Sequence, residues 1–275
     1  MAHTVEEEAF QGEDLGERTD ELRALFLKHA SHARSEPSLD KRLVDLVLSH
    51  ARSIVSHPAK PMRRELLNFY DDPAGEIALE ESLEENPALD GIENLWVERQ
   101  AEKTFPCVTM LDCSFSMAGD KHLLSSIAVA VLLLEVPVND TSLVVFGSQA
   151  KSLKALREQQ PRETTVLEFL KHKPAGFTNI ARGLEEGLSQ LAAGRASKRK
   201  IGILATDGRS TEGEDPLEVA RRFDQLVVLH LHGPGSHLEA SQKLAEHGGG
   251  TCLEVEEFAQ LPRRLYEALR VLARA

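Results

Sequence analysis

The sequence predicts an α/β fold, a doubly wound and mostly parallel sheet flanked by helices, with a helical, acidic extension before it. Three observations lead to this fold class. After about residue 103, short apolar runs alternate with longer amphipathic segments, as in strand–helix–strand crossovers. Before that point, helical spacing of apolar residues dominates. The length of 275 residues allows one large domain with a substantial extension.

The first hundred residues hold nearly all of the net charge of −12. They carry 22 acidic and 11 basic side chains, whereas residues 101–275 carry 22 and 21. We expect residues 1–19 to be a disordered acidic tail, because they are highly charged and offer little surface to bury. Residues 20–100 are expected to form a helical extension, in which Ser38 can cap a helix that continues to about Ile54.

The segment 71–98 of this extension has ten carboxylates and no lysine or arginine. Such a run is most often a solvated face, but it can also contact a basic partner protein. Because the overall charge is negative, a general phosphate-backbone binder is disfavoured and no nucleic-acid partner is expected. The acidic side chains that we consider for partner docking are Glu76, Glu80, Glu81, Glu84 and Glu85.

Residues 101–275 are expected to form the sheet and its helices. Strand candidates are short apolar runs bounded by polar residues, and helix candidates repeat apolar residues at three- and four-residue spacing. The stretch Ala128–Leu134 is apolar on nearly every side, as expected of a helix buried against a sheet. The strand candidates are Cys107–Leu111, Ser142–Phe146, Ile201–Ala205, Leu226–Leu231 and Thr251–Val255. The helix candidates are Leu123–Val136, Val166–Lys171, Asn179–Leu191, Pro216–Phe223, His237–His247 and Phe258–Leu272.

Three loops of this predicted sheet carry oxygen-bearing side chains. Ligands bind such sheets at the carboxyl ends of the strands, where Asp112, Ser114 and Ser116 follow the first strand and Asp207 follows the third. Thr178 precedes a helix. Each group alone is an ordinary cap or turn, but together two carboxylates and three hydroxyls favour Mg²⁺, with Mn²⁺ or Ca²⁺ as alternatives. The five residues are therefore metal-ligand candidates.

The segments Asp112-Cys113-Ser114-Phe115-Ser116-Met117, Gly176-Phe177-Thr178-Asn179 and Ala205-Thr206-Asp207-Gly208 resemble the metal-ion-dependent adhesion site (MIDAS) of von Willebrand factor A (VWA) domains. The resemblance covers about residues 105–275 and implies a VWA, Rossmann-like fold. It also implies that Ser114 and Ser116 bind the metal directly, Thr178 directly or through water, and Asp112 and Asp207 mainly through waters. The metal then seeks an anionic ligand, which in this family is typically an Asp or Glu of a partner protein.

A second resemblance concerns the residues before the sheet. Gly75–Glu80, Ser82-Leu83-Glu84 and Trp96–Arg99 are similar to segments of bacterial intracellular VWA proteins associated with MoxR-type AAA+ ATPases. This similarity implies a non-catalytic adaptor that works with such an ATPase in protein maturation, including metal or cofactor insertion.

Catalytic signatures are missing from the sequence. It has no GxxxxGK[ST], HExxH or GxSxG motif, so we assign no catalytic residue and expect a non-enzyme. A metal-dependent phosphoester hydrolase is the first alternative, but it needs a general base that we cannot assign. An RNA-associated VWA protein is the second. His230 and His232 alternate onto one strand face and are read as structural, and Cys113 as a small buried residue with redox sensing as the alternative.

The expected location follows from the cysteines and the apolar runs. Three cysteines without a CxxC spacing fit a reducing compartment. The first ten residues lack the basic and apolar regions of a signal peptide, and the longest strongly apolar run is too short to span a bilayer. We therefore expect a cytoplasmic protein without a membrane partner.

Overall fold

The described part of the chain forms two compact units. The computed structural model describes residues 12–31, 37–55, 62–88, 91–102, 106–136, 140–193 and 199–256, with single residues at 260, 264, 267 and 268. The first unit combines the residues before 57 with those after 104, and the second unit is residues 57–104. Each is described by itself below.

The first unit is built on a six-stranded sheet with the strand order β6-β5-β4-β7-β8-β9. All neighbouring strands are parallel except β6, which is antiparallel to β5. The predicted doubly wound fold and its five strands are confirmed, whereas the antiparallel edge strand β6 was not predicted. The strands are β4 (Cys107–Asp112), β5 (Thr141–Phe146), β6 (Ala150–Lys154), β7 (Ile201–Thr206), β8 (Gln225–Leu231) and β9 (Cys252–Val255).

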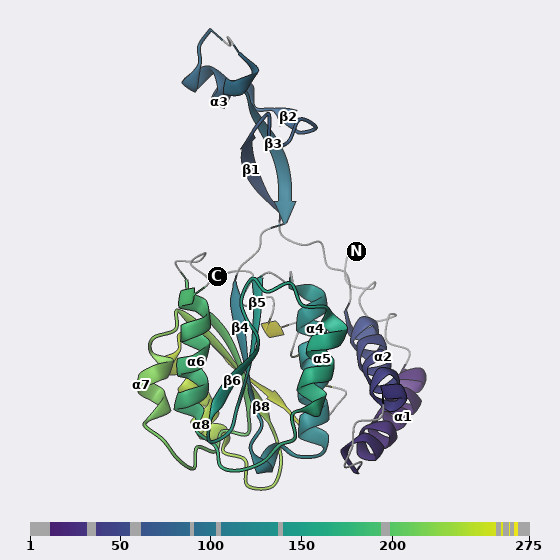
Figure 1. The fold of residues 1–275 in the computed structure, drawn as a ribbon. Helices are drawn as coiled ribbons and strands as arrows, with labels where there is room; N and C mark the ends of the chain where they lie inside the picture. The colour runs from purple at the N-terminus through teal and green to yellow at the C-terminus, as the bar shows by residue number, and fades with distance from the viewer. Residues whose placement is uncertain are drawn as a thin grey trace, which may run out of the picture. The chain divides into compact units, whose positions relative to one another are not determined.

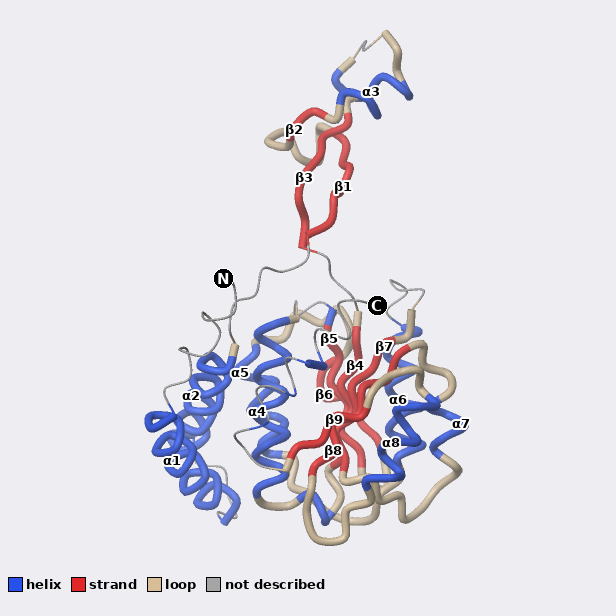
Figure 2. The backbone as a smooth tube through the Cα atoms, turned by 180° about the vertical axis from the view of Figure 1, so that it is seen from behind, coloured by secondary structure: helices blue, strands red, loops and turns tan. Residues whose placement is uncertain are grey.

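Helices cover both faces of this sheet (Figures 1 and 2). One face packs against α4 (Asp120–Glu135) and α5 (Arg162–Lys171). The other packs against α6 (Ile180–Ala193), α7 (Pro216–Ala220) and α8 (Leu238–His247). Each face has its own hydrophobic core. The predicted helix Phe258–Leu272 lies largely outside the described residues.

Two N-terminal helices complete the first unit by covering the outer side of α4. They are α1 (Gly12–Ser31) and α2 (Pro37–Ile54), and α2 packs against α4 and α5. The residues Lys121–Leu133 of α4 are all buried, because the sheet lies on one side of the helix and α2 on the other (Figure 2). This double cover explains why the helix is apolar on nearly every side.

Polar contacts fix the N-terminal helices in place. Asp40 of α2 is buried, and its Oδ1 accepts a hydrogen bond of 3.1 Å from His29 Nε2. Its Oδ2 forms an ion pair with Lys171 Nζ at 3.0 Å. Arg23 of α1 donates two hydrogen bonds of 3.0 Å to the carboxylate of Asp120, the first residue of α4. The two helices therefore belong to the sheet-containing unit.

The second unit is a small antiparallel sheet with the strand order β1-β3-β2. Cross-strand ion pairs hold it, with Arg64 2.7 Å from Glu98 and Arg99 3.0 Å from Glu65. Its elements are β1 (Met62–Asn68), β2 (Glu76–Ile77), α3 (Leu79–Glu85), the short 3₁₀ turn η1 (Ile92–Asn94) and β3 (Trp96–Glu102).

The structure differs in three respects from the expected division into residues 1–19, 20–100 and 101–275. The extension is helical only in part, because β1 and β3 are antiparallel strands whose charged residues form ion pairs across the two strands. The unit boundaries fall near residues 57 and 104 rather than at 101. Helix α1 already begins at Gly12, inside the segment expected to be disordered, and residues 1–11 lie outside the described part.

Candidate metal centre

The candidate metal residues gather where the winding of the sheet reverses. In the sheet, β4 lies between β5 and β7. The chain runs from β4 to β5 and β6 on one side, and then returns to β7, β8 and β9 on the other side. Asp112 ends β4 and Asp207 directly follows β7. Ligands of doubly wound sheets bind at this switch point, at the carboxyl ends of the strands.

Asp112 is fully buried and held from two sides. Its Oδ1 accepts a hydrogen bond of 2.9 Å from the Ser114 backbone N–H, and its Oδ2 accepts one of 2.8 Å from Thr206 Oγ1. Burial raises the pKa of Asp112 to about 6, although the hydrogen bonds from Ser114 and Thr206 partly oppose this rise. The two hydrogen bonds, one to each carboxylate oxygen, fix the orientation of the Asp112 side chain.

The loop after β4 places two hydroxyls side by side. A short 3₁₀ turn, η2 (Phe115–Met117), brings Ser114 Oγ to 3.3 Å from Ser116 Oγ. Ser114 is buried and Ser116 is half-buried, so of the two hydroxyl-bearing residues Ser116 is the more accessible. Two neutral hydroxyls at this separation can act as ligands of one hard cation.

Backbone hydrogen bonds tie the Thr178 loop to the loop after β4. The Phe115 N–H donates to the Gly176 carbonyl oxygen at 3.2 Å, and the Ala175 N–H donates to that of Cys113 at 2.9 Å. Thr178 itself is buried, and its N–H donates to Thr211 Oγ1 at 2.9 Å. Three predicted hydroxyls therefore come from two connected loops.

Asp207 is held by a tight turn and by a lysine that the sequence analysis missed. Its Oδ2 accepts from Lys121 Nζ at 3.0 Å and its Oδ1 from the Arg209 N–H at 3.2 Å. The next residue, Gly208, has a φ of 79°, and a Cβ there would clash with the carbonyl oxygen of His237. Only glycine fits this turn, which directs the fully buried carboxylate of Asp207 back toward the site.

Lys121 is the second residue of α4, and only 10% of its side chain is exposed. Its stem passes over Gly233, where a Cβ would approach Lys121 Cε to 2.5 Å. A lysine at the start of an otherwise apolar helix was the available signal, because its stem and charge must be buried with the helix. Lys121 places one positive charge beside the buried carboxylate of Asp207.

The donor set fits a hard divalent cation. The five predicted residues offer carboxylate and hydroxyl oxygens, with no sulfur or imidazole nitrogen. The neighbouring Cys113 is buried, and burial raises the pKa of its thiol, so it carries no thiolate that would attract a softer metal.

Two phenylalanines beside the hydroxyls are largely exposed. Phe115 stands between the two serines with 75% of its surface exposed, and Phe177 precedes Thr178 with 65% exposed. Large apolar side chains exposed next to a polar site are typical of protein-binding surfaces. Both residues belong to the MIDAS-like segments of the sequence, but the motif itself indicates no role for their side chains.

The remaining predicted residues lie elsewhere. The acidic docking candidates are on the second unit, where Glu81 pairs with Arg64 at 2.8 Å and Glu85 accepts a hydrogen bond of 3.1 Å from Trp96 Nε1. Glu76, Glu80 and Glu84 are exposed. His230 is buried in the first unit, and its Nδ1 forms a hydrogen bond of 2.8 Å with Ser241 Oγ.

No helix among the described residues is both long enough and apolar enough to cross a membrane.

Comparison with curated protein sequences gave no significant match. Solved structures gave similar folds. An aerotolerance-related membrane protein from Bacteroides fragilis aligns with a TM-score of 0.51 and 14% identity, over 62% of this chain and 100% of its own. The conserved hypothetical protein BatB from Bacteroides thetaiotaomicron aligns with a TM-score of 0.53 and 18% identity, with the same coverages.

A third similar structure is a matrix protein of the mussel byssus whose MIDAS motif is occupied by zinc. It aligns with a TM-score of 0.52 and 19% identity, over 62% of this chain and 48% of its own. At these identities the three structures show a common fold only. The family model of the von Willebrand factor type A domain matches residues 108–267, which is more than half of the chain. The chain therefore belongs to the VWA domain family.

Proposed function

We propose that this chain is a non-catalytic, Mg²⁺-dependent protein-docking module. Asp112, Ser114, Ser116, Thr178 and Asp207 would hold the ion, and an Asp or Glu of a partner protein would complete its coordination. The bound ion would supply a concentrated positive charge and an open coordination position. The buried ion pair between Lys121 and Asp207 is the observation that carries this proposal.

The ion pair matters because it sets the charge of the site. Asp112 and Asp207 bring two negative charges, and Lys121 cancels one of them within 3.0 Å. The hydroxyls are neutral, so the protein offers a formal charge of −1 to a dication. One positive charge then remains, which favours an anionic ligand from outside. A protein built to neutralise the metal would place a third carboxylate, rather than a lysine, at this position.

The exposed phenylalanines limit the kind of partner segment that would bind well at the site. Phe115 and Phe177 put apolar surface directly beside the hydroxyls. A partner segment that presents a carboxylate next to an apolar side chain would satisfy both features, since the rings are buried as the carboxylate docks. A small hydrophilic anion would leave the rings exposed.

Magnesium is the ion that we favour, with Mn²⁺ and Ca²⁺ as alternatives, because all five donors are hard oxygens. The zinc in the mussel protein's motif supports divalent binding by this fold but does not select the ion. Calorimetric titration of the metal-free chain with Mg²⁺, Mn²⁺, Ca²⁺ and Zn²⁺ would rank them. We expect Asp112→Ala to abolish Mg²⁺ binding. Asp45→Ala, which removes an exposed carboxylate on α2, is the control and should preserve Mg²⁺ binding.

Partner capture tests the docking role itself. The tagged chain would be incubated with lysate of its native cells in Mg²⁺ or in excess chelator, and the proteins captured only with Mg²⁺ would be identified. We expect Asp112→Ala and the double change Phe115→Ser and Phe177→Ser to lose them, and Asp45→Ala to retain them. Equal capture in chelator would refute the proposal.

We further propose a MoxR-type AAA+ ATPase as a partner, a role in protein maturation or metal insertion, and a reducing, cytoplasmic location. The exposed Glu76, Glu80 and Glu84 of the second unit offer negative charge to a basic surface. Their combined change to Gln should weaken binding to a purified MoxR-type ATPase, and more so at low salt. The same change at the exposed Glu218, Glu239 and Glu246 of the first unit is the matched control.

The hydrolase and RNA-binding alternatives gain no support from the described residues. A hollow of about 680 Å³ lies beside the turn at Gly208, but none of the five metal candidates lines it. Burial lowers the pKa of His230 to about 4, and its Nδ1 is bonded to Ser241, so it is not a base exposed to a substrate. A phosphoester hydrolase would still be detected as turnover that disappears in Asp112→Ala.

A further inference from the structure

A second polar region lies at the same sheet edge, on the other side of β8 from Asp207. The register places Thr206 of β7 opposite His230 of β8, and His230 opposite Glu254 of β9. Paired residues of parallel strands face the same side of a sheet. A polar row therefore runs from the candidate metal centre across β8 to β9.

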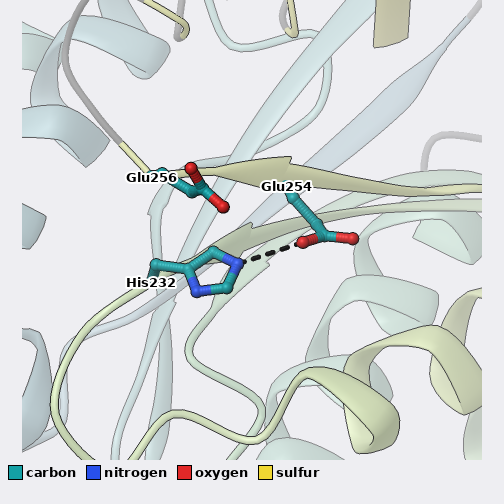
Figure 3. Close-up of side chains that lie close together, drawn as sticks. All are labelled: His232, Glu254 and Glu256. Atoms are coloured by element: carbon teal, nitrogen blue, oxygen red, sulfur yellow. Dashed lines mark hydrogen bonds and ion pairs between the residues drawn. The ribbon is translucent and has the colours of Figure 1, made fainter.

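The row ends in a cluster of three metal-binding side chains, His232, Glu254 and Glu256 (Figure 3). One ligand atom from each lies within 4.8 Å of the other two. His232 Nε2 is 3.1 Å from Glu254 Oε2. Ligands bound at about 2.0–2.2 Å from one ion are at most about 4.4 Å apart, so small side-chain rotations would bring the three atoms to one ion.

The backbone on both sides of the cluster is held in place. The His232 N–H donates to the Val255 carbonyl oxygen at 3.1 Å, which joins the ends of β8 and β9. Arg264 Nε donates to the carbonyl oxygen of Glu254 at 3.0 Å, and the Glu256 N–H donates to Gln260 Oε1 at 3.0 Å. The three side chains therefore project from positions that are fixed before any ion binds.

The cluster is open to solvent. The side chains of His232 and Glu254 are 31% and 38% exposed, and Glu256 is exposed. Among the described residues, no lysine or arginine forms an ion pair with either glutamate's carboxylate. The guanidinium of Arg264 contacts the Glu254 carbonyl oxygen and the Glu267 carboxylate rather than the carboxylates of the cluster, so the two negative charges of Glu254 and Glu256 would be offset by a divalent ion.

His230 is an independent sign that something polar is missing next to this cluster. Its side chain is fully buried, yet its Nε2 has no hydrogen-bond partner among the described residues. Its ring stands edge-on to that of His232, with 4.8 Å between the ring centres. Buried polar atoms are normally satisfied, so an unpartnered nitrogen on a ring that packs against His232 supports a polar ligand at this place, such as an ion with its waters.

We propose that His232, Glu254 and Glu256 form a second divalent-cation site, separate from the candidate MIDAS. An imidazole together with two carboxylates suits a borderline transition ion such as Zn²⁺ better than Mg²⁺. His232 follows β8, one strand from β7, and the two glutamates are at the end of β9, two strands from β7, so at the usual strand spacing of about 4.8 Å the cluster lies about 5–10 Å to the side of Asp207. This separation exceeds the distance of about 3.5–4 Å between the two metal ions of two-metal hydrolases. The second ion therefore adds a binding site and no hydrolytic centre.

Zinc stoichiometry tests the site. The metal-free, full-length chain would be dialysed against buffered Zn²⁺, and bound zinc would be measured by elemental analysis. We expect Glu254→Gln with Glu256→Gln to remove one bound zinc per chain while Mg²⁺ binding is unchanged. Glu239→Gln with Glu246→Gln, on exposed positions of α8, is the matched control and should remove none.

Asp112→Ala separates the two sites, because it should abolish Mg²⁺ binding and leave the zinc held by the cluster. If the Glu254 and Glu256 changes prevent folding, His232→Gln removes the one imidazole ligand at a partly exposed position and should remove the same zinc. Co²⁺ provides a second readout, since its visible spectrum changes when the imidazole is lost. Unchanged zinc content in His232→Gln and in the folded double variant would overturn the proposal.

Discussion

The role of Lys121 is best tested by Lys121→Met, which keeps the length and apolar stem of the side chain but removes its charge. Asp207 is fully buried and its Oδ2 is 3.0 Å from Lys121 Nζ. Removing one partner of a buried ion pair leaves an uncompensated charge and costs about 3–5 kcal/mol of folding free energy. The metal-free variant should therefore unfold at a much lower urea concentration than the wild type.

Magnesium should reverse much of this loss, because the protein now offers a charge of −2 instead of −1. At a free concentration of 100 times Kd, a bound ligand stabilises the folded state by about 2.7 kcal/mol, and each tenfold gain in affinity adds about 1.4 kcal/mol. We expect the urea midpoint of Lys121→Met to rise more with Mg²⁺ than that of the wild type. Partner capture should weaken, since less positive charge remains for the partner's carboxylate.

Lys243→Met is the matched control for these urea titrations in chelator and in Mg²⁺. Lys243 forms an exposed ion pair with Glu239 at 2.7 Å, and such pairs contribute little to stability. The reasoning is refuted if Lys121→Met is no less stable than Lys243→Met in chelator. It is also refuted if Mg²⁺ stabilises Lys121→Met no more than the wild type.

Three further predictions concern the scaffold. Burial lowers the pKa of His122, between Phe26 and Phe169, to about 4, so the unfolded state binds the proton first. The contribution of His122 to stability should fall by about 3 kcal/mol from pH 6.5 to 4, so the free energy of unfolding of His122→Leu should fall less over this range than that of the wild type; an equal fall contradicts this. Leu43→Ala, at a fully buried position of α2, should cost about 2–5 kcal/mol in urea titration, whereas the 56%-exposed Leu27→Ala should cost little; equal effects would refute packing by α2. Gly183→Ala would place a Cβ 2.5 Å from the Phe146 ring and should cost about 1–3 kcal/mol, so an unchanged urea midpoint would show that the ring moves freely.

The sheet could be predicted because its strands carry a local signal. β4, β5 and β7 are buried along their whole length, so they appear in the sequence as short, continuous apolar runs. The polar loop residues at their ends are equally local. Fold class and the loops of the candidate centre therefore follow from neighbouring residues alone.

The second unit could not be predicted in this way. β1 and β3 are rich in charged residues, and their stability depends on partners such as Glu65 and Arg99, which are 34 positions apart in the chain. Charged side chains at these spacings are equally compatible with an exposed helix. Only the antiparallel pairing shows which charges neutralise each other.

The same limit applies to the charges around the two metal candidates. Lys121 and Asp207 are 86 positions apart, and His232 and Glu254 are 22 apart. The sequence contains these residues, but their pairing depends on the strand order that brings β7, β8 and β9 together. The types of metal-ligand side chains could be read from the motif. The net charge around the candidate sites could be counted only once the fold showed which charged residues lie together.

The N-terminal helices connect this charge balance to the rest of the unit. Arg23 of α1 binds the carboxylate of Asp120, the residue directly before Lys121, while α2 covers the outer side of α4. The first turn of α4 is therefore fixed from both sides, by α1 outside and by the Asp207 carboxylate inside. A lysine must be held this firmly if it is to cancel one charge of the site without occupying the place of the ion. The N-terminal helices α1 and α2 are thus part of the scaffold that sets the charge offered to a metal, and their removal would alter the site as well as the stability.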